Sequence, residues 1–395
     1  MLAFINARLI DGTGNPALEN AAILIDGDTV ADVGRGLDIP AGSRIIDVGG
    51  NTVMPGLFDA HVHIGGSDSR EGDQLVGLDK SEAFAEARRL LLAAGVTGIR
   101  SAGDFEASIL ELRTMEAAGE IRSPRVYTCG KCIQPVGGHP AYTVWVSDPD
   151  ILENAISSPE TADAARAEVR RQSALGADHI KLFLADDNYI EPGKKAPRLK
   201  PEVLFAAAEE AHLHGLKVMV HCQEPGFALE ALEAGADSIE HLFCSGHELD
   251  PLPDGLAGAF KKNGAFLVPT LVSTMSLDPS KEARAAVFTA VKELFEAGVR
   301  LAVGTDYGTP LIPVDKAVHV EMELLAEAGI PPLSVIEAAT RNCAELAGDS
   351  RLGLLEPGRL ADMVVVRGNP LEDMSCMESV CIVVKNGEIL SNTLN

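Results

Sequence analysis

Hydrophobic and polar positions alternate over short distances at both ends of the chain. Near the N-terminus, the alternating segments 2–10, 21–34 and 43–53 contain or adjoin Asp-Gly, Gly-Asp and Gly-Gly turns. Near the C-terminus, segments 360–368 and 379–390 have the same texture, with Gly-Asn and Asn-Gly turns. A period of two that is broken by such turn residues is typical of short β-strands. We therefore expect β-structure at both ends of the chain.

Between these ends, apolar runs of strand length alternate with segments of helical periodicity. The expected strands are 57–64, 97–103, 125–130, 179–184, 217–222, 238–243, 266–271 and 300–306. The expected helices lie near 80–94, 106–118, 160–175, 201–214, 226–234, 255–263 and 280–297, and two more lie near 315–328 and 332–347. Strands that are separated by helices pair in parallel through right-handed crossovers. Eight such units predict a closed (β/α)8 barrel, the TIM barrel.

The two β-rich ends are too short for each to form a stable domain alone. Residues 1–54 and 355–395 each fall below the size at which a segment easily buries its own core. We predict that both ends together form one small β-sandwich domain, into which the barrel is inserted as residues 55–354. The predicted fold class is therefore α/β, a TIM barrel with a composite β domain.

Composition and charge exclude several classes of partner. The chain has 58 acidic and 33 basic residues and a formal net charge of −25, which leaves no broad basic surface for nucleic acid or an anionic membrane. No apolar run is long enough to span a membrane, and the first residues do not resemble a signal peptide. We expect a cytoplasmic protein that forms a homo-oligomer and acts on a small molecule.

The seven cysteines fit reduced thiols in such a compartment. Cys129 and Cys132 have CxxC spacing, but no second pair completes a zinc knuckle. A redox or zinc role for this pair is the alternative to two ordinary buried thiols.

Candidate metal ligands occupy the ends of five of the eight predicted strands. They are His61 and His63 on the first strand, Lys181 on the fourth, His221 on the fifth, His241 on the sixth and Asp306 on the eighth. Barrels of this kind carry their chemistry at the C-terminal ends of the strands. Residues two apart on a strand face the same way, so both imidazoles of the HVH motif can enter the barrel. A lone histidine on an apolar strand is usually a core residue, but this concentration of ligands favours a metal site.

Lys181 lies within the apolar strand HIKLFL. Alternation directs Ile180 and Leu182 outward and Lys181 inward. Burial of a lone ammonium group is costly, so its pKa should fall and the neutral amine should be favoured. A neutral amine can add CO₂, and the resulting carbamate could bridge two metal ions. The alternative is an ion pair between Lys181 and a nearby carboxylate such as Asp186 or Asp187.

Asp306 ends the predicted strand LAVGTD. A carboxylate at this position can bind metal and can also accept a proton from metal-activated water, which makes Asp306 the candidate catalytic residue. The alternative is that it caps the helix that follows.

These residues together resemble the amidohydrolase superfamily of metal-dependent hydrolases. The resemblance rests on VMPGLFDAHVHI, IKLFLADD, VMVHCQ, SIEHLF and GTDYGTP, and it continues through AATRNCAELAG and LGLLEPGRLADMVVVRGNPLED. Within the superfamily, the chain is most similar to the imidazolonepropionase-related, prolidase-like branch. That branch implies a centre of two divalent metal ions, usually zinc with Mn, Fe or Co as alternatives, and a carboxylated lysine bridge.

The resemblance also implies a role for each matching residue. The first metal would be bound by His61, His63 and Asp306, the second by His221 and His241, and carboxylated Lys181 would bridge them. His139, in GGHP, would contact the substrate, although Pro140 replaces the glycine usual there. Tyr142 is a further candidate for substrate or oxyanion contact, and His319, which also matches the branch, is interpreted as structural. The implied reaction is hydrolysis of an amide C–N bond in a dipeptide, an N-acyl amino acid or a cyclic amide.

One motif supports a second hypothesis. His221 and Glu224 have HxxE spacing, in which a superfamily deaminase or imidazolone-type ring hydrolase uses the glutamate as proton shuttle with a single metal. Glu224 could equally be an acid at a helix N-terminus, because Pro225 follows it. A third hypothesis is a non-catalytic scaffold of the same fold, which the complete set of ligand residues disfavours.

Overall fold

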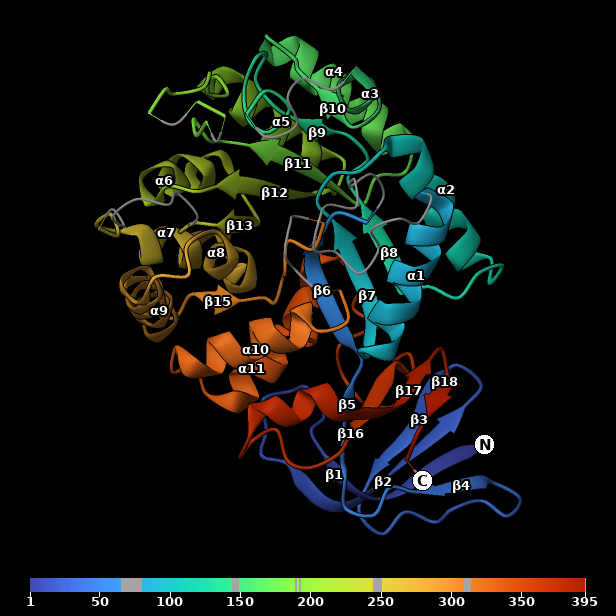
Figure 1. Cartoon of the computed structure of the whole chain (residues 1–395). Coiled ribbons are helices and arrows are strands. Elements are labelled where there is room, and N and C mark those ends of the chain that lie inside the picture. The colour runs from blue at the N-terminus through green and yellow to red at the C-terminus, as the bar shows by residue number, and fades with distance from the viewer. Residues whose placement is uncertain are drawn as a thin grey trace.

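The structure is a computed structural model of the chain, and it describes residues 1–64, 80–143, 149–188, 190–191, 193–243, 251–308 and 314–394. Figure 1 shows a barrel surrounded by helices and, below it, a β-sheet that contains both chain ends. No helix in these ranges combines the length and the apolar character needed to cross a membrane.

Strands from both chain ends share one sheet. It is eight-stranded, with the order β18-β17-β16-β5-β1-β2-β3 and with β4 paired to β1. β5 joins the two ends, because it pairs in parallel with β1 on one side and antiparallel with β16 on the other. The strands are β1 Leu2–Leu9, β2 Leu18–Asp26, β3 Thr29–Gly34, β4 Arg44–Asp47, β5 Thr52–Pro55, β16 Met363–Val366, β17 Val380–Lys385 and β18 Glu388–Asn392. Both chain ends therefore contribute strands to one β-sheet.

This sheet has a hydrophobic core distinct from that of the barrel. Phe4, Ile23 and Val53 from the N-terminal strands pack with Met363 and Ile382 from the C-terminal strands, and all are buried. The burial of β1 and β3 does not follow a strict period of two, because Ala3 and Phe4 are both buried and each strand has one exposed residue, Asn6 in β1 and Asp32 in β3. Because neither end supplies this core alone, the sheet depends on both ends of the chain.

Eight parallel strands form the barrel. They are β6 Leu57–Val62, β7 Val96–Ser101, β8 Arg125–Thr128, β11 His179–Phe183, β12 Lys217–Cys222, β13 Ser238–His241, β14 Phe266–Val268 and β15 Arg300–Leu301. All residues of β6, β7, β11 and β13 are buried, as expected for strands covered on both faces. A small parallel pair, β9 Cys132–Ile133 and β10 Ile156–Ser157, adjoins β11.

Hydrogen bonds between backbone groups close the barrel. After β15 the chain continues along β6: Ala60 N donates to Val303 O at 2.9 Å, and Asp306 N donates to His61 O at 2.8 Å. On the other side, Asp178 N donates to Thr128 O at 2.8 Å and joins the edges of β8 and β11. The eighth strand thus lies beside the first, which brings His61 and Asp306 together.

Helices cover the outside of the barrel (Figure 1). They are α1 Lys80–Ala93, α2 Glu106–Ala117, α3 Pro149–Asn154, α4 Ala162–Ala174, α5 Pro201–Leu213, α6 Pro225–Ala234, α7 Leu256–Asn263, α8 Leu271–Leu277, α9 Lys281–Glu296, α10 Ala317–Glu327, α11 Pro332–Ala338 and α12 Arg341–Leu346, and a 3₁₀ turn η1 spans Met374–Ser379. The predicted helices are present within a few residues, whereas α3, α8 and η1 were not predicted.

The predicted helix 332–347 is divided into α11 and α12. The carbonyls of Ala338 and Ala339 accept hydrogen bonds from Val303 N at 3.0 Å and Phe58 N at 2.9 Å in the barrel strands. Those carbonyls therefore bond to the barrel strands, where a continuous helix would bond them to its own backbone N–H groups. The helix breaks at Thr340, which has φ −131° and ψ −89°.

Candidate active site

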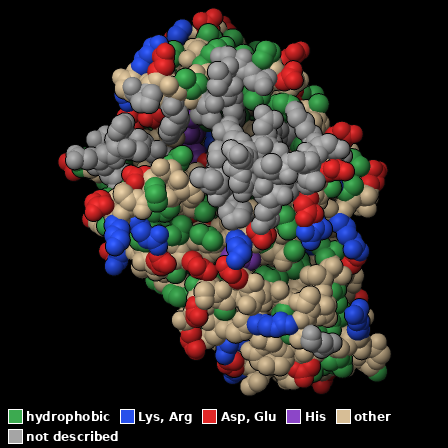
Figure 2. Space-filling view, viewed as in Figure 1, with side chains coloured by type: hydrophobic (Ala, Val, Ile, Leu, Met, Phe, Trp, Pro, Cys, Tyr) green, Lys and Arg blue, Asp and Glu red, His purple; other side chains and the backbone are tan. Residues whose placement is uncertain are grey.

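The six predicted ligand residues lie at the C-terminal ends of the barrel strands. His61 belongs to β6, Lys181 to β11, His221 to β12 and His241 to β13, whereas His63 directly follows β6 and Asp306 lies in the segment after β15 that continues along β6. Figure 2 shows histidine at the bottom of a hollow in this face of the molecule. Positions up to 245 residues apart in sequence, from His61 to Asp306, thus meet in one pocket.

Asp306 lies between the two imidazoles of the HVH motif. Its Oδ1 is 3.4 Å from His61 Nε2 and 3.3 Å from His63 Nε2. His61, His241 and Asp306 each offer one ligand atom, and these atoms all lie within 4.8 Å of one another. All three side chains are buried, so the group is a candidate metal site.

The remaining predicted ligands adjoin this group. The ring centroid of His241 lies 4.7 Å from that of His61 and 4.6 Å from that of His221. Lys181 Nζ lies 5.0 Å from the centre of the Phe183 ring, which in turn lies 4.7 Å from the His221 ring. The structure therefore arranges the imidazoles and the amine around one small volume.

Three polar atoms in this pocket are buried and have no hydrogen-bond partner among the described residues. They are His61 Nε2, Lys181 Nζ and His221 Nε2. A buried polar atom is normally satisfied, and one that is not costs free energy. Imidazole nitrogen is also a common ligand of Zn and other divalent ions. The donor set and its unsatisfied atoms therefore fit a bound divalent metal.

Burial decides the charge of most of these groups. It lowers the pKa of His61 and His221 well below the ordinary value and lowers that of His241 to about 4. Burial likewise lowers the pKa of Lys181. The neutral imidazole is the form that binds metal, and the neutral amine is the form that can react with CO₂.

His63 and Asp306 form the charged pair of the pocket. Burial alone would lower the pKa of His63, but its contact with Asp306 outweighs burial and raises the pKa to about 9. Burial alone would raise the pKa of Asp306, but its contacts with the surrounding histidines, above all the hydrogen bond from His63, hold the pKa well below the ordinary value. The carboxylate is therefore ionised and available as a ligand or proton acceptor.

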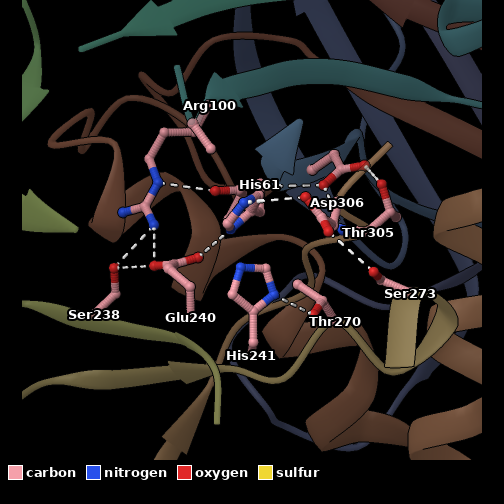
Figure 3. Close-up of polar contacts among 12 residues, drawn as sticks. His61, Arg100, Ser238, Glu240, His241, Thr270, Ser273, Thr305 and Asp306 are labelled. Carbon is pink, nitrogen blue, oxygen red and sulfur yellow. Dashed lines mark hydrogen bonds and ion pairs between the residues drawn. The ribbon is translucent and has the colours of Figure 1, made fainter. Parts of the chain in front are cut away.

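A buried network orients His61 (Figure 3). His61 Nδ1 lies 2.6 Å from Glu240 Oε2 in β13. Glu240 also accepts a hydrogen bond from Arg100 Nη2 at 2.8 Å and one from Ser238 Oγ. Arg100 in turn donates to Ala60 O at 2.9 Å. A carboxylate on one ring nitrogen fixes the tautomer and leaves the other nitrogen for the metal.

Other contacts orient the remaining ligands. His63 Nδ1 lies 2.8 Å from Gly103 O, and His241 Nδ1 lies 2.8 Å from Thr270 Oγ1. In Figure 3, Ser273 lies on the side of Asp306 away from His61, and its Oγ donates a hydrogen bond to Asp306 Oδ2 at 2.9 Å. These contacts occupy the Nδ1 atoms of His63 and His241 and Oδ2 of Asp306, so the other side-chain nitrogen or oxygen of each residue is left for the pocket.

Left-handed backbone conformations direct several of these side chains. His241, Thr270 and Asp306 have φ of 71°, 45° and 59°. Non-glycine residues rarely adopt such values, and they cluster at functional sites where surrounding contacts hold them. At His241, the turn lets two consecutive residues, Glu240 and His241, both contribute to the interior, which strict alternation would forbid.

His139, the predicted substrate contact, lies beside His221. Its ring centroid lies 4.6 Å from that of His221 and its Nδ1 lies 2.8 Å from Thr143 Oγ1. Burial lowers its pKa to about 3, so the ring is neutral. Tyr142, three residues further along, is 37% exposed. His139 therefore lies where it can contact a bound substrate, and Tyr142 lies nearer to solvent.

Glu224 and His319 lie in other surroundings. Glu224 Oε1 accepts a hydrogen bond from Lys195 Nζ at 2.8 Å, and its carboxylate belongs to a partly exposed group with Asp186 and Asp187. His319 Nε2 lies 2.8 Å from the backbone O of Ala94, the residue that directly follows α1, and its side chain is buried. Its contact agrees with the structural interpretation.

The two cysteines of the CxxC motif are buried free thiols. Cys132 Sγ donates to Ala102 O at 3.4 Å, next to the Gly103 carbonyl that holds His63.

Sequence reasoning missed the acids that support the site. Asp59 accepts hydrogen bonds from Thr305 N at 3.0 Å and Thr305 Oγ1 at 2.6 Å, and it fixes the end of the eighth strand. Glu240, which contacts His61 Nδ1, was likewise not predicted. The signal was present, because a lone acid inside an apolar strand such as LFDAHV or SIEH is costly to bury without a partner.

Comparison with known proteins assigns the family. Residues 52–390 match the amidohydrolase family, and the chain belongs to that family. It is accordingly a hydrolase that acts on carbon–nitrogen bonds, with a buried His/His/Asp group suited to metal.

Relatives resemble the chain over nearly its whole length. An ochratoxinase of Aspergillus niger is 28% identical over 437 residues, which cover 96% of this chain and 85% of the relative. An imidazolonepropionase of Geobacillus kaustophilus is 26% identical over 390 residues, which cover 88% of this chain and 84% of the relative. Among solved structures, a Xaa-Pro dipeptidase with methionine bound in the active site has a TM-score of 0.81 and 26% identity, and the match covers 99% of this chain and 100% of that chain.

Proposed function

We propose that the protein is a binuclear metal-dependent amidohydrolase that cleaves an amide C–N bond of a small molecule. The observation that carries the proposal is the set of buried, unsatisfied atoms His61 Nε2, Lys181 Nζ and His221 Nε2 around the His241–Asp306 group. Three such atoms in one pocket would be costly unless a ligand satisfies them.

Two sets of residues would bind the metals. His61, His63 and Asp306 would hold one ion, His221 and His241 would hold the other, and Lys181 would join them. Divalent cations bound there, Zn or else Mn, Fe or Co, would supply the positive charge that polarises a carbonyl group and acidifies water.

Lys181 would act as a carbamate. The neutral amine adds CO₂ at Nζ and releases one proton, which leaves an anionic group with two oxygens. Two features support this step: the lowered pKa of the buried amine and the absence of a hydrogen-bond partner for Nζ among the described residues. Among the described residues, the carboxylate of Asp186 is paired with Lys195 at 2.7 Å and not with Lys181.

The chain's own residues would then handle substrate and protons. Asp306 would accept the proton of the attacking water at Oδ1 and return it to the leaving nitrogen. Ser273 would keep the other oxygen, Oδ2, in place through its 2.9 Å hydrogen bond. His139, buried beside His221, would contact the carbonyl end of the substrate.

The substrate class follows from the relatives. An ochratoxinase, a Xaa-Pro dipeptidase and an imidazolonepropionase are among them, and together they favour a dipeptide, an N-acyl amino acid or a cyclic amide. The competing hypothesis is a mononuclear ring hydrolase or deaminase that uses Glu224 as proton shuttle. The ion pair of Glu224 with Lys195 argues against it, because that pair directs the carboxylate toward the exposed acidic group.

Metal content and turnover test the proposal together. Protein loaded with Zn should bind two equivalents and hydrolyse at least one member of a panel of dipeptides, N-acyl amino acids and cyclic amides. Lys181→Ala should lose metal and turnover, and millimolar acetate or propionate should restore part of both by supplying the two missing oxygens. One bound metal, with activity lost in Glu224→Gln but not in Lys181→Ala, would establish the competing hypothesis.

A further inference from the structure

A glutamate outside the candidate site is buried against a short helix that borders it. Glu321 in α10 is fully buried. Its Oε1 accepts a hydrogen bond from Leu271 N at 2.9 Å, and its Oε2 accepts one from Val272 N at 2.7 Å. These are the first two residues of α8, so one carboxylate satisfies two backbone N–H groups that the helix itself leaves without partners.

The same end of α8 contacts two of the candidate ligands. Thr270, the residue before the helix, places its Oγ1 2.8 Å from His241 Nδ1. Ser273, in the first turn, donates from Oγ to Asp306 Oδ2 at 2.9 Å. Figure 3 shows Thr270 and Ser273 reaching these two ligands from one segment of the chain. A shift of this segment would therefore disturb both ligands at once.

The segment needs an external restraint. Thr270 has φ of 45°, a left-handed conformation that is unfavourable for a β-branched residue. No side chain caps α8 from within its own sequence, since Thr270 makes no cap hydrogen bond. The contact that holds the N-terminus of α8 comes from Glu321, across the interface between α8 and α10.

We propose that Glu321 is a positioning residue of the metal site, which acts through α8 to hold Thr270 and Ser273 against His241 and Asp306. The inference rests on the proposed metal-dependent function. The contact uses both oxygens of the Glu321 carboxyl group, one for the N–H of Leu271 and one for the N–H of Val272. Glutamine offers one acceptor, and its amide N–H₂ would face the second N–H donor.

Metal affinity of Glu321→Gln tests the proposal without reliance on turnover. Competition with a chelator should give Zn²⁺ affinity about 10–100-fold weaker than in the unaltered protein, which is the usual effect of losing an outer contact of a metal ligand. Substitution with Co²⁺ should also alter the visible absorption spectrum, because the ligand geometry changes.

Asp362→Asn is the matched control. Asp362 is also a buried acid that accepts a backbone hydrogen bond, from Asn386 N at 2.7 Å, but it directly precedes β16 of the composite β-sheet. It should lose stability and retain Zn²⁺ affinity. Equal loss of affinity in Asp362→Asn and Glu321→Gln would mean that Glu321 acts only on general stability, and the proposal would be overturned.

A double-mutant cycle tests the route through α8. Ser273→Ala alone should weaken Zn²⁺ binding, and in the Glu321→Gln background it should weaken binding by a smaller factor, because the helix has already moved. Losses that simply multiply would show that Glu321 does not act through Ser273.

A measurement on the unaltered protein covers the case in which Glu321→Gln does not fold. If the site and α8 are coupled, Zn²⁺ must stabilise the helix end as much as the helix end stabilises Zn²⁺ binding. Hydrogen exchange of the Leu271 and Val272 amides should slow when Zn²⁺ is added, and unchanged exchange would refute the coupling. Protein that binds no metal at all would instead refute the proposed function on which the inference rests.

Discussion

Replacing Lys181 by methionine should stabilise the metal-free protein while it abolishes the metal bridge. Methionine is apolar and of similar length, so it fills the space of the lysine without a buried amine. In the unaltered protein, Lys181 Nζ is buried with no hydrogen-bond partner among the described residues. The substitution therefore removes a group that opposes folding, and it separates the roles of Lys181 in stability and in function.

The size of the effect follows from the cost of an unsatisfied buried donor, about 1–3 kcal/mol. At about 2.1 cal/mol/K per residue, a chain of this length has an unfolding entropy on the order of 0.8 kcal/mol/K. If unfolding is a single cooperative transition, its midpoint temperature should then be about 1–4 °C higher in Lys181→Met than in the unaltered protein. With added Zn²⁺ and bicarbonate, the unaltered protein should become the more stable of the two, because these ligands stabilise only the protein that can form the complete site.

The pH dependence gives a second signature. Burial lowers the pKa of Lys181 in the folded protein, so between that pKa and about 10.4 the unfolded chain binds more protons than the folded one. The stability of the metal-free protein should therefore increase as pH rises through this window. Lys181→Met should remove this contribution.

Thermal unfolding of chelator-treated protein, followed by circular dichroism from pH 7 to 10, measures both effects. Lys262→Met, at an exposed position in α7, is the matched control and should change neither. A metal-free Lys181→Met protein that is less stable than the unaltered one would refute the reasoning, because Nζ would then have a favourable partner. Full metal content in the variant would refute the bridge.

The other predictions concern single contacts. His139→Ala should lower kcat/KM and leave metal content intact, and loss of metal would place His139 among the ligands. Glu224→Gln should retain most activity, since its carboxylate is ion-paired at the edge of the site; abolished turnover would show otherwise. Glu240→Ala should cost about 3–5 kcal/mol in denaturant unfolding by leaving Arg100 buried without its carboxylate, and an unchanged midpoint would contradict this. Deletion of 355–395 should give insoluble protein, whereas a soluble, active fragment would contradict the predicted composite domain.

The barrel, and the position of each candidate ligand at the end of its strand, could be predicted because their signals are local. HVH encodes two same-facing imidazoles within three residues, and Lys181 stands out within one apolar strand. Parallel strands in a closed barrel bring their C-terminal ends together, so a ligand needs only to be placed at the end of its strand. The strand boundaries were less accurate: the residues after Leu301 bond to β6 and were counted as a longer strand.

The contacts that orient the ligands could not be predicted from local patterns. His61 and Glu240 are 179 residues apart, and Leu271 and Glu321 are 50 apart. Helix α8 was missed because LVSTMSL has no capping residue of its own and depends on Glu321 from another helix. Such supporting contacts depend on tertiary packing, which periodicity does not encode.

The position of β5 between the two chain ends has a consequence for synthesis. The partner of β5 on one edge, β1, precedes it in the chain, whereas its partner on the other edge, β16 at Met363–Val366, is made much later. At about 5–20 residues per second, the ribosome needs roughly 15–60 s to add the intervening barrel. For that time the nascent chain carries an open strand edge, which is a template for intermolecular pairing. Expression yield should therefore depend on how quickly translation reaches the last strands, and a chaperone that covers this edge would act before the barrel is complete.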